Sequence, residues 1–312
     1  MASLPKVSIV VTLVCLAFTS AANTSSQNQA SDRADRDRVM LNVTVWNRTG
    51  FVKGLNREAF SVSDEKTEKP IEFFENQDVP LSVGILIDNS TSMQPRVERI
   101  AEGLTEFVRL GHQDNEYFFL SFSDAPKLAL DWASSQHILS RKIDIKPGKG
   151  KTALYDSGII AIEKLREAKF SRRILVLISD GQDSSSLRTF KELRESLGRS
   201  DLTLYAIGVL GGADIGSSLG MEGQGVLDEL AYISGGASFY PKNRKEMSFA
   251  FTQIASELRH LHRIGFRRDP NNPPNKWRRL KVKITPPSDA QEFRKLCEPD
   301  RVTIVTEFGA AF

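Results

Sequence analysis

The 312-residue sequence has few cysteines and histidines, the residues that build disulfides and soft-metal sites. It contains two cysteines, Cys15 and Cys297, and four histidines. Cys15 lies in an N-terminal stretch that we expect to be removed, and the single remaining thiol cannot form an internal disulfide. Stability must therefore come from packing. The helical pattern around His260 and His262 predicts ordinary surface histidines, not a chelating pair.

The sequence also lacks a strong excess of one charge. It has 42 basic and 39 acidic residues, with a formal net charge of +3. This balance gives no reason to expect nucleic-acid or membrane binding. The basic stretch at residues 259–283, with Phe266 and Trp277 interleaved, is interpreted as a solvated strand face.

No apolar run is long enough for a comfortable membrane span. The apolar run at residues 7–18 follows Lys6 and precedes small residues, which is the order of a secretory signal peptide. We expect residues 1–22 to be cut off after Ala22 and residues 23–37 to form a flexible lead-in; the alternative is an uncleaved anchor. The mature chain is then expected to be extracellular or periplasmic, without a membrane span.

Hydrophobic periodicity predicts two kinds of structure along the chain. Residues 38–78 and 263–312 contain short strands, which we expect to pair as one small β domain. Residues 79–262 alternate buried strands such as 81–87 with helical stripes. This order predicts an α/β fold, a doubly wound and mostly parallel sheet. Within it, Ser186 is expected to cap a helix.

Two segments look like catalytic motifs but are interpreted otherwise. Residues 147–156 look like half of a phosphate-binding loop, yet Ile145 stands where a Walker loop needs its first glycine. Residues 216–220 match the Gly-x-Ser-x-Gly pattern of hydrolases. However, six glycines among residues 211–225 favour a flexible loop, which we expect to lie at the rim of the candidate site.

Polar side chains from three loops are predicted to meet at one edge of the sheet. Asp88, Ser90 and Ser92 follow one buried strand, Asp180 follows another, and Thr152 lies on a loop entering a helix. The carboxyl ends of strands in an open α/β sheet share one crevice. In an extended Asp-x-Ser-x-Ser loop, alternate residues point the same way. Hard oxygen donors of this kind suit one Mg²⁺ or Mn²⁺ ion.

These residues resemble the metal-ion-dependent adhesion site of von Willebrand factor type A (VWA) domains. The match extends to Met93 after the first motif, to the Thr-Ala-Leu-Tyr-Asp stretch beginning at Thr152, and to the Asp-Gly pair at 180–181, within residues 79–262. Residues 47–74 are also similar to the region that precedes the domain in exported VWFA-related proteins of acidobacteria. One departure is Thr91, where such loops often have glycine.

The resemblance implies a Rossmann-like VWA fold and a role for each site residue. Ser90, Ser92 and Thr152 would bind the metal through their hydroxyls, and Asp88 and Asp180 would act largely through bound waters. A second metal site is not expected, because the sequence after the first motif lacks a further acidic pair.

The function implied is a non-enzymatic binding or adhesion module. The open position on the cation would take an Asp or Glu carboxylate from a protein partner. Two alternatives stay open. One is a metal-assisted hydrolase of phosphate esters, although no general base is evident beside the site. The other is a structural component of the cell envelope.

Overall fold

The structure is a computed structural model that describes residues 8–14, 38–47, 50–52, 55–141, 143, 145, 148–211, 216–271, 277–284 and 304–311. The chain divides into two compact units. One, the β unit, contains residues 1–78 and 260–312, and the other, the α/β unit, contains residues 79–259. None of the helices in the described ranges is long and apolar enough to cross a bilayer.

The α/β unit is built on a six-stranded sheet with the order β12-β11-β10-β7-β8-β9. Neighbouring strands are parallel except β8 and β9, which are antiparallel. The predicted mostly parallel sheet is therefore confirmed. The strands are β7 (Ser82–Asp88), β8 (Glu116–Phe122), β9 (Pro126–Ser134), β10 (Arg173–Ser179), β11 (Leu202–Gly208) and β12 (Ser238–Phe239).

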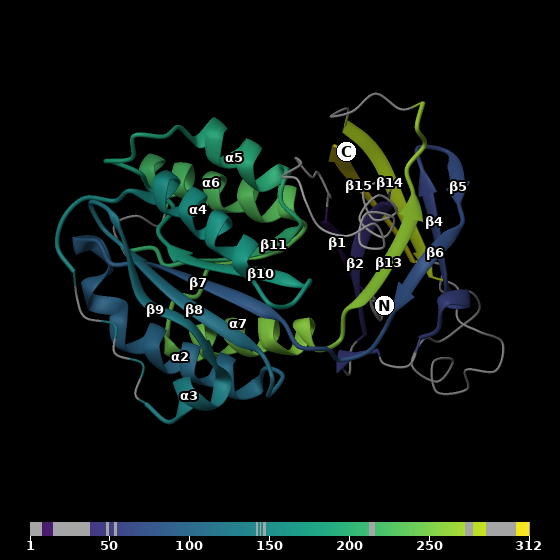
Figure 1. The fold of residues 1–312 in the computed structure, drawn as a ribbon. Helices are drawn as coiled ribbons and strands as arrows, with labels where there is room; N and C mark the ends of the chain where they lie inside the picture. The colour runs from purple at the N-terminus through teal and green to yellow at the C-terminus, as the bar shows by residue number, and fades with distance from the viewer. Residues whose placement is uncertain are drawn as a thin grey trace, which may run out of the picture. The chain divides into compact units, whose positions relative to one another are not determined.

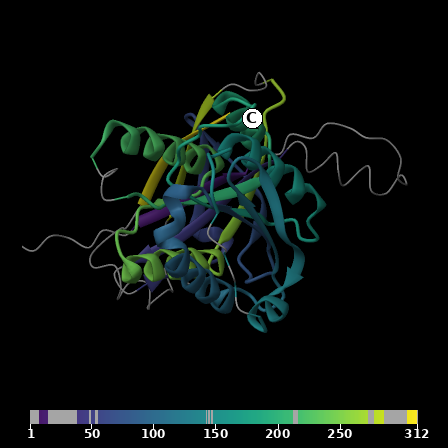
Figure 2. The same ribbon diagram turned by 90° about the vertical axis from the view of Figure 1, so that its left-hand side faces the viewer.

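Helices cover both faces of this sheet, as a doubly wound fold requires. They are α2 (Val97–Leu110), α3 (Ser135–Leu139), α4 (Leu154–Lys164), α5 (Phe190–Gly198), α6 (Ser218–Ser234) and α7 (Arg244–Leu258). Figure 1 shows α4, α5 and α6 on one face and α2, α3 and α7 on the other. Figure 2 shows the same layers after a quarter turn. Two short 3-10 helices, η2 (Thr91–Arg96) and η3 (Leu165–Glu167), complete the unit.

The central strands β7, β10 and β11 are apolar because both of their faces are covered. Every residue of β7 and β11 is buried, as is every residue of β10 after Arg173. The register pairs Ile87 with Ile178. Asp88 and Ser179 therefore leave the sheet at the same level, which positions the candidate site.

The helix α5 begins at a different residue from the one predicted. Its N-cap is Thr189, whose hydroxyl accepts from Glu192 N at 3.3 Å, while the Glu192 carboxylate accepts from Thr189 N at 2.8 Å. This reciprocal capping box satisfies two exposed donors at once. Ser186 instead donates to Asp183 at 2.6 Å and accepts from Asp156 N at 3.1 Å, so it braces the preceding loop.

The glycine-rich segment is helical from Ser218 onward, so the prediction of a flexible loop was wrong there. Ser217 caps α6, with its hydroxyl accepting from Gly220 N at 3.0 Å. A Cβ on Gly223 would lie 2.3 Å from the Asp180 carbonyl oxygen. The missing side chain thus lets α6 approach the loop after β10. Residues 212–215 lie outside the described ranges.

The β unit contains two sheets, with the orders β1-β2-β13-β6 and β15-β14-β4-β5, and β3 pairs with β2. The pairing of β4 with β14 joins the N-terminal and C-terminal segments, which confirms the prediction that they form one β domain. The elements are β1 (Ser8–Val14), β2 (Arg38–Asn47), β3 (Gly50–Phe51), η1 (Arg57–Ala59), β4 (Phe60–Asp64), β5 (Thr67–Lys69), β6 (Ile71–Glu75), β13 (His262–Arg267), β14 (Trp277–Ile284) and β15 (Ile304–Ala311).

His262 is buried in the β unit, so the prediction of a surface histidine was wrong for this residue. Its side chain is 3% exposed and its ring lies 5.1 Å from the ring of Phe60. Its Nδ1 lies 3.2 Å from the Val43 carbonyl oxygen. The helix α7 ends at Leu258 and β13 begins at His262. The alternation of the strand, not a helical period, therefore decides which way His262 points.

Part of the predicted signal peptide is described as a strand. Ser8–Val14 forms β1, which pairs antiparallel with β2 at the edge of its sheet. Cleavage of the leader stays a prediction. Residues 15–37, which include the predicted cleavage position and lead-in, lie outside the described ranges.

Candidate metal centre

Asp88 ends the central strand β7 and is almost fully buried. Its Oδ1 accepts from Ser90 N at 2.9 Å, and the side chain is 1% exposed. Ser90 is the N-cap of η2, and its hydroxyl lies 3.1 Å from the Ser92 hydroxyl. The predicted convergence of these side chains is present, but the predicted extended loop is wrong. A 3-10 turn beginning at Thr91 brings Ser92 back beside Ser90.

Asp180 links the loop after β10 to the loop after β7. The Ser92 hydroxyl donates to Asp180 Oδ2 at 2.8 Å. The other carboxylate oxygen, Oδ1, accepts from Gln182 N at 3.1 Å. The structure therefore brings Asp88, Ser90, Ser92 and Asp180 into one hydrogen-bonded cluster, in which Asp88, Ser90 and Asp180 are buried and Ser92 is exposed.

Ser179 belongs to this cluster, although the sequence motifs do not single it out. Its hydroxyl donates to Asp88 Oδ2 at 2.7 Å and accepts from Gly181 N at 3.1 Å. It reaches Asp88 because β7 and β10 are adjacent parallel strands. Its place directly before Asp180, level with Asp88 in the register, is the signal that could have found it.

Thr152 lies on a loop that is hydrogen-bonded to both of the other loops. Gly150 N donates to the Thr91 hydroxyl at 3.3 Å, and Thr152 N donates to the Ser184 hydroxyl at 3.0 Å. The Thr152 side chain is 8% exposed. Among the described residues, its hydroxyl forms no hydrogen bond with the other four predicted ligands. The backbone thus holds Thr152 at the same rim with its hydroxyl uncommitted.

The cluster has a negative charge that no basic side chain of the described residues neutralises by an ion pair. Burial is the largest effect that raises the pKa of Asp88, and the nearby charge of Asp180 is the second; together they bring the pKa to about 6. Hydrogen bonds from Ser90 and Ser179 lower the pKa but do not offset these two effects. Within the described residues, neither Asp88 nor Asp180 forms an ion pair with a basic side chain. Two buried carboxylates without a counter-charge are costly. The residues present therefore fit a bound cation.

The donor set selects the kind of cation. It consists of carboxylate and hydroxyl oxygens, which suit hard divalent ions. The described residues contain no group of three or more His, Cys, Asp or Glu side chains able to hold a metal. A site here must therefore depend on hydroxyl ligands in addition to its two carboxylates.

The fold and this cluster together define a class of protein, an open α/β domain with an oxygen-donor site at the carboxyl ends of its strands. Residues 83–182 match the family model of the von Willebrand factor type A domain. The α/β unit is accordingly a VWA domain. Such domains commonly mediate metal-dependent protein binding and often hold a divalent metal in an adhesion site.

Several solved structures resemble the chain. BatB from Bacteroides thetaiotaomicron is 18% identical over 57% of this chain and 98% of its own, with a TM-score of 0.45. A von Willebrand factor type A protein from Catenulispora acidiphila is 11% identical, and the match covers 99% of this chain and 74% of that protein, with a TM-score of 0.46. Proximal thread matrix protein 1 from the mussel byssus is 16% identical, and the match covers 63% of this chain and 49% of that protein, with a TM-score of 0.45. The structure of that protein has a zinc-occupied adhesion site. Among curated protein sequences, none matches this chain significantly.

Replacing Gly181 with alanine is expected to destabilise the site and the fold. Gly181 has φ +82°, and an added Cβ would lie 2.1 Å from the Gly223 carbonyl oxygen. The left-handed backbone and the clash with a backbone atom together predict a loss of about 1–3 kcal/mol in the free energy of unfolding. Urea denaturation in EDTA measures it.

Gly198→Ala is the matched control. A Cβ there meets nothing within 4 Å, and the residue ends α5 without a left-handed φ. Its free energy of unfolding should stay constant or rise by up to about 1 kcal/mol. Equal effects of the two substitutions would contradict the packing of α6 on the Asp180 loop.

Proposed function

We propose that this protein is a non-enzymatic binding module that holds one Mg²⁺ ion and captures an acidic side chain of a protein partner. The observation that carries the proposal is the hydrogen-bonded cluster of Asp88, Ser90, Ser92 and Asp180, which joins two loops, contains two buried carboxylates and has no basic counter-charge among the residues that the structure describes. Thr152 approaches from a third loop with an uncommitted hydroxyl. Three loops with oxygen donors at one sheet edge form a cation site, and no imidazole or thiol belongs to the proposed set.

The proposed ligands divide into neutral and charged groups. Ser90, Ser92 and Thr152 would bind the ion directly, and Asp88 and Asp180 would hold it largely through water. Because neutral ligands leave most of the positive charge on the cation, the ion keeps a strong attraction for an external carboxylate. The carboxylates of Asp88 and Asp180 would balance the positive charge of the ion and orient the hydroxyl ligands. This division supports binding of an acidic partner group.

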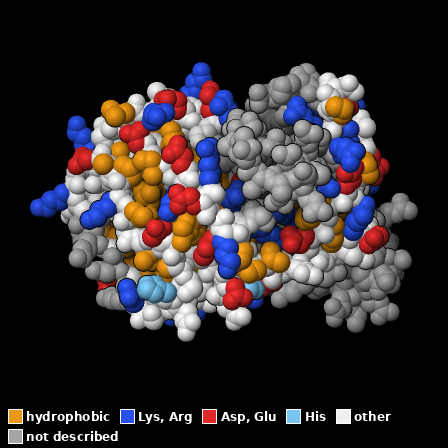
Figure 3. Space-filling view, viewed as in Figure 1, with side chains coloured by type: hydrophobic (Ala, Val, Ile, Leu, Met, Phe, Trp, Pro, Cys, Tyr) orange, Lys and Arg blue, Asp and Glu red, His pale blue; other side chains and the backbone are white. Residues whose placement is uncertain are grey.

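The surface supports a protein partner more than a nucleic acid. The face of the α/β unit visible in Figure 3 carries basic, acidic and apolar side chains intermixed. The whole chain has a net charge of only +3. A nucleic-acid site would require a concentrated basic surface.

A peptide-display selection in Mg²⁺ tests this function directly. Peptides retained in Mg²⁺ and eluted by EDTA are expected to contain an essential Asp or Glu. Replacing that residue with Asn or Gln keeps the shape and removes the charge, and it should abolish retention. Selected peptides that ignore both EDTA and the charge would contradict the proposal.

Thr152→Val separates a metal ligand from a structural residue. Valine keeps the branched shape, and the Thr152 hydroxyl has no hydrogen bond within the described protein to lose. In EDTA the free energy of unfolding should therefore change by less than about 0.5 kcal/mol. Mg²⁺ affinity, measured by calorimetry, should fall about tenfold or more, as expected for a lost interaction with a charged group.

Thr105→Val is the control for removing a threonine hydroxyl. Thr105 lies on α2 and donates to Ala101 O at 2.8 Å, away from the proposed ligands. Mg²⁺ affinity should not change in this variant. If Thr152→Val also keeps full Mg²⁺ affinity, Thr152 is not a ligand. If it loses the metal but retains the selected peptides, the ion has only a structural role.

We also propose that the protein is exported through its N-terminal leader. The support is the order of a basic residue, an apolar run and small residues before position 23. Cleavage after Ala22 would remove β1 and leave β2 at the edge of its sheet. N-terminal sequencing of the protein recovered outside the cytoplasm should begin at Asn23, and an intact N-terminus on exported protein would rule out cleavage.

A further inference from the structure

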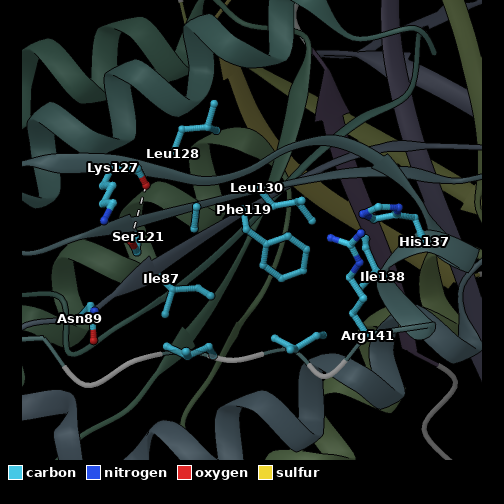
Figure 4. A pocket seen from close by; sticks show the side chains of 13 residues that line it. Ile87, Asn89, Phe119, Ser121, Lys127, Leu128, Leu130, His137, Ile138 and Arg141 are labelled. Carbon is cyan, nitrogen blue, oxygen red and sulfur yellow. Dashed lines mark hydrogen bonds between the residues drawn. The ribbon is translucent and has the colours of Figure 1, made fainter.

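A second concave site lies in the α/β unit, separate from the proposed metal ligands. It has a volume of about 470 Å³ and is lined by residues of β7, β8, β9 and α3 and by two isoleucines beyond α3 (Figure 4). Pockets that bind small molecules typically measure about 300–1,000 Å³. None of the five predicted metal ligands lines it, although Asn89, next to Asp88, lies at one end.

The pocket has an apolar body with basic groups at its ends. Its apolar side chains include Ile87, Phe119, Leu128, Leu130, Ile138 and Ile145. Among the described residues that line it, the ionisable side chains are Lys127, His137 and Arg141, and none is a carboxylate. A ligand that matches this lining has a hydrophobic chain and a negative charge.

The basic side chains are available to a ligand. Among the described residues, neither Lys127 nor Arg141 forms an ion pair, whereas Lys164 and Arg173 in the same unit bind Asp131 and Asp201. Free basic side chains around an apolar pocket therefore supply charge complementarity for an anion.

Arg141 and His137 lie together at one end of the pocket. In Figure 4 both are at the end opposite Lys127 and Asn89. The Arg141 N–H donates to Ile138 O at 3.1 Å, which continues the turn of α3. Residues four apart on such a turn face the same side. A carboxylate at this end could contact both groups, while Phe119 and Leu130 line the space beyond.

We propose that this pocket binds an aliphatic carboxylate of the fatty-acid class. The carboxylate lies against Arg141 and His137, and the chain lies along Phe119, Leu130 and Ile138. Because each buried methylene contributes hydrophobic free energy, affinity should rise about three- to fourfold for each carbon added until the pocket is full.

Calorimetry on the full chain in EDTA tests the proposal with three probes below their micellar concentrations. Decanoate should bind, decanol should bind about tenfold more weakly because it lacks the charge, and acetate should not bind. Equal binding of decanoate and decanol, or no decanoate binding, would overturn the proposal. EDTA removes divalent ions, so failure here is independent of the metal-site proposal.

Two variants locate the binding. Arg141→Ala should weaken decanoate binding about tenfold and leave decanol binding unchanged. Arg199→Ala, which removes a basic side chain at the end of α5, should change neither. Leu130→Trp should reduce the binding of both probes by filling the pocket, with circular dichroism verifying the fold. Decanoate binding that is unaffected by Arg141→Ala would overturn the assignment of its carboxylate.

Discussion

Asp180→Ala is expected to abolish the stabilisation that Mg²⁺ gives the wild-type protein. At a free Mg²⁺ concentration about 100 times the dissociation constant, the wild-type protein should gain about 2.7 kcal/mol in its free energy of unfolding. Asp180 accepts from the Ser92 hydroxyl at 2.8 Å, so its loss removes both a charge and the group that orients a proposed ligand. Urea denaturation in Mg²⁺ and in EDTA measures the difference.

Asp114→Ala is the control for removing a carboxylate. Its side chain is 63% exposed and lies outside the cluster. This variant should keep the whole Mg²⁺ effect. An equal Mg²⁺ effect in Asp180→Ala and in the wild-type protein would show that the ion acts elsewhere.

Asp88→Asn is expected to stabilise the metal-free protein while it removes metal binding. Asparagine keeps the carbonyl oxygen that can accept from Ser90 N, and its amide can donate to the Ser179 hydroxyl. It eliminates the buried charge that Asp180 repels. A pKa raised from 3.8 to about 6 corresponds to roughly 2–3 kcal/mol of destabilisation at neutral pH, which the variant should recover.

The pH dependence of the free energy of unfolding, compared between the wild-type protein and Asp88→Asn, measures the raised pKa of Asp88 independently. Since the folded-state pKa of Asp88 lies above its unfolded value, the native state binds the extra proton between pH 6 and 3.8. The metal-free wild-type protein should therefore gain stability relative to Asp88→Asn as the pH falls through 6, and lose it as the pH rises. Parallel stability profiles of the two proteins in EDTA between pH 4 and 7 would contradict the raised pKa.

The opposite effects of Asp88→Asn on stability and on metal binding would identify Asp88 as a functional residue. A carboxylate retained only for folding should stabilise the metal-free protein. Here burial and the Asp180 charge make the ionised form unfavourable until a cation arrives. The ionised Asp88 therefore destabilises the metal-free protein, as expected of a functional site whose charge is balanced only when its ligand binds.

Most of the strands and helices of the fold could be predicted from hydrophobic periodicity. The runs that became β7 and β10 are almost entirely apolar because helices cover both faces of the sheet. In the β unit, Leu280, Val282 and Ile284 alternate with basic residues, and all three side chains are 0% exposed. An alternation of this kind follows directly from which side chains are buried, so a strand can be predicted from it without knowledge of the fold.

The elements that periodicity missed depend on tertiary contacts. Strand β9 begins at Pro126 and lies at the edge of its sheet, where exposure weakens the alternation. Helix α6 contains several glycines, which favour loops in isolation. One of them, Gly223, is needed because the backbone of the Asp180 loop leaves no room for a Cβ. Close packing between distant segments overrode the local preference.

The candidate site likewise has residues that local sequence patterns predict and features that depend on tertiary contacts. The motif residues Asp88, Ser90, Ser92 and Asp180 could be predicted because each follows a buried strand. The turn that brings Ser92 to Ser90 could not be predicted from spacing, which suggested an extended loop. Ser179 was missed because its role arises from the register between β7 and β10, and a single sequence does not contain that register explicitly.

The central claim is that three loops meet around one divalent ion, which two of the loops bind through the hydroxyl oxygens of Ser90, Ser92 and Thr152 and the third supports through the Asp180 carboxylate. Anomalous diffraction from crystals soaked in Mn²⁺ tests it most directly. A single anomalous peak is expected at coordination distance, close to the 2.1 Å typical of Mg²⁺, from the hydroxyl oxygens of Ser90, Ser92 and Thr152. A fully soaked crystal without a peak among these oxygens, or with its ion bound elsewhere, would contradict the account.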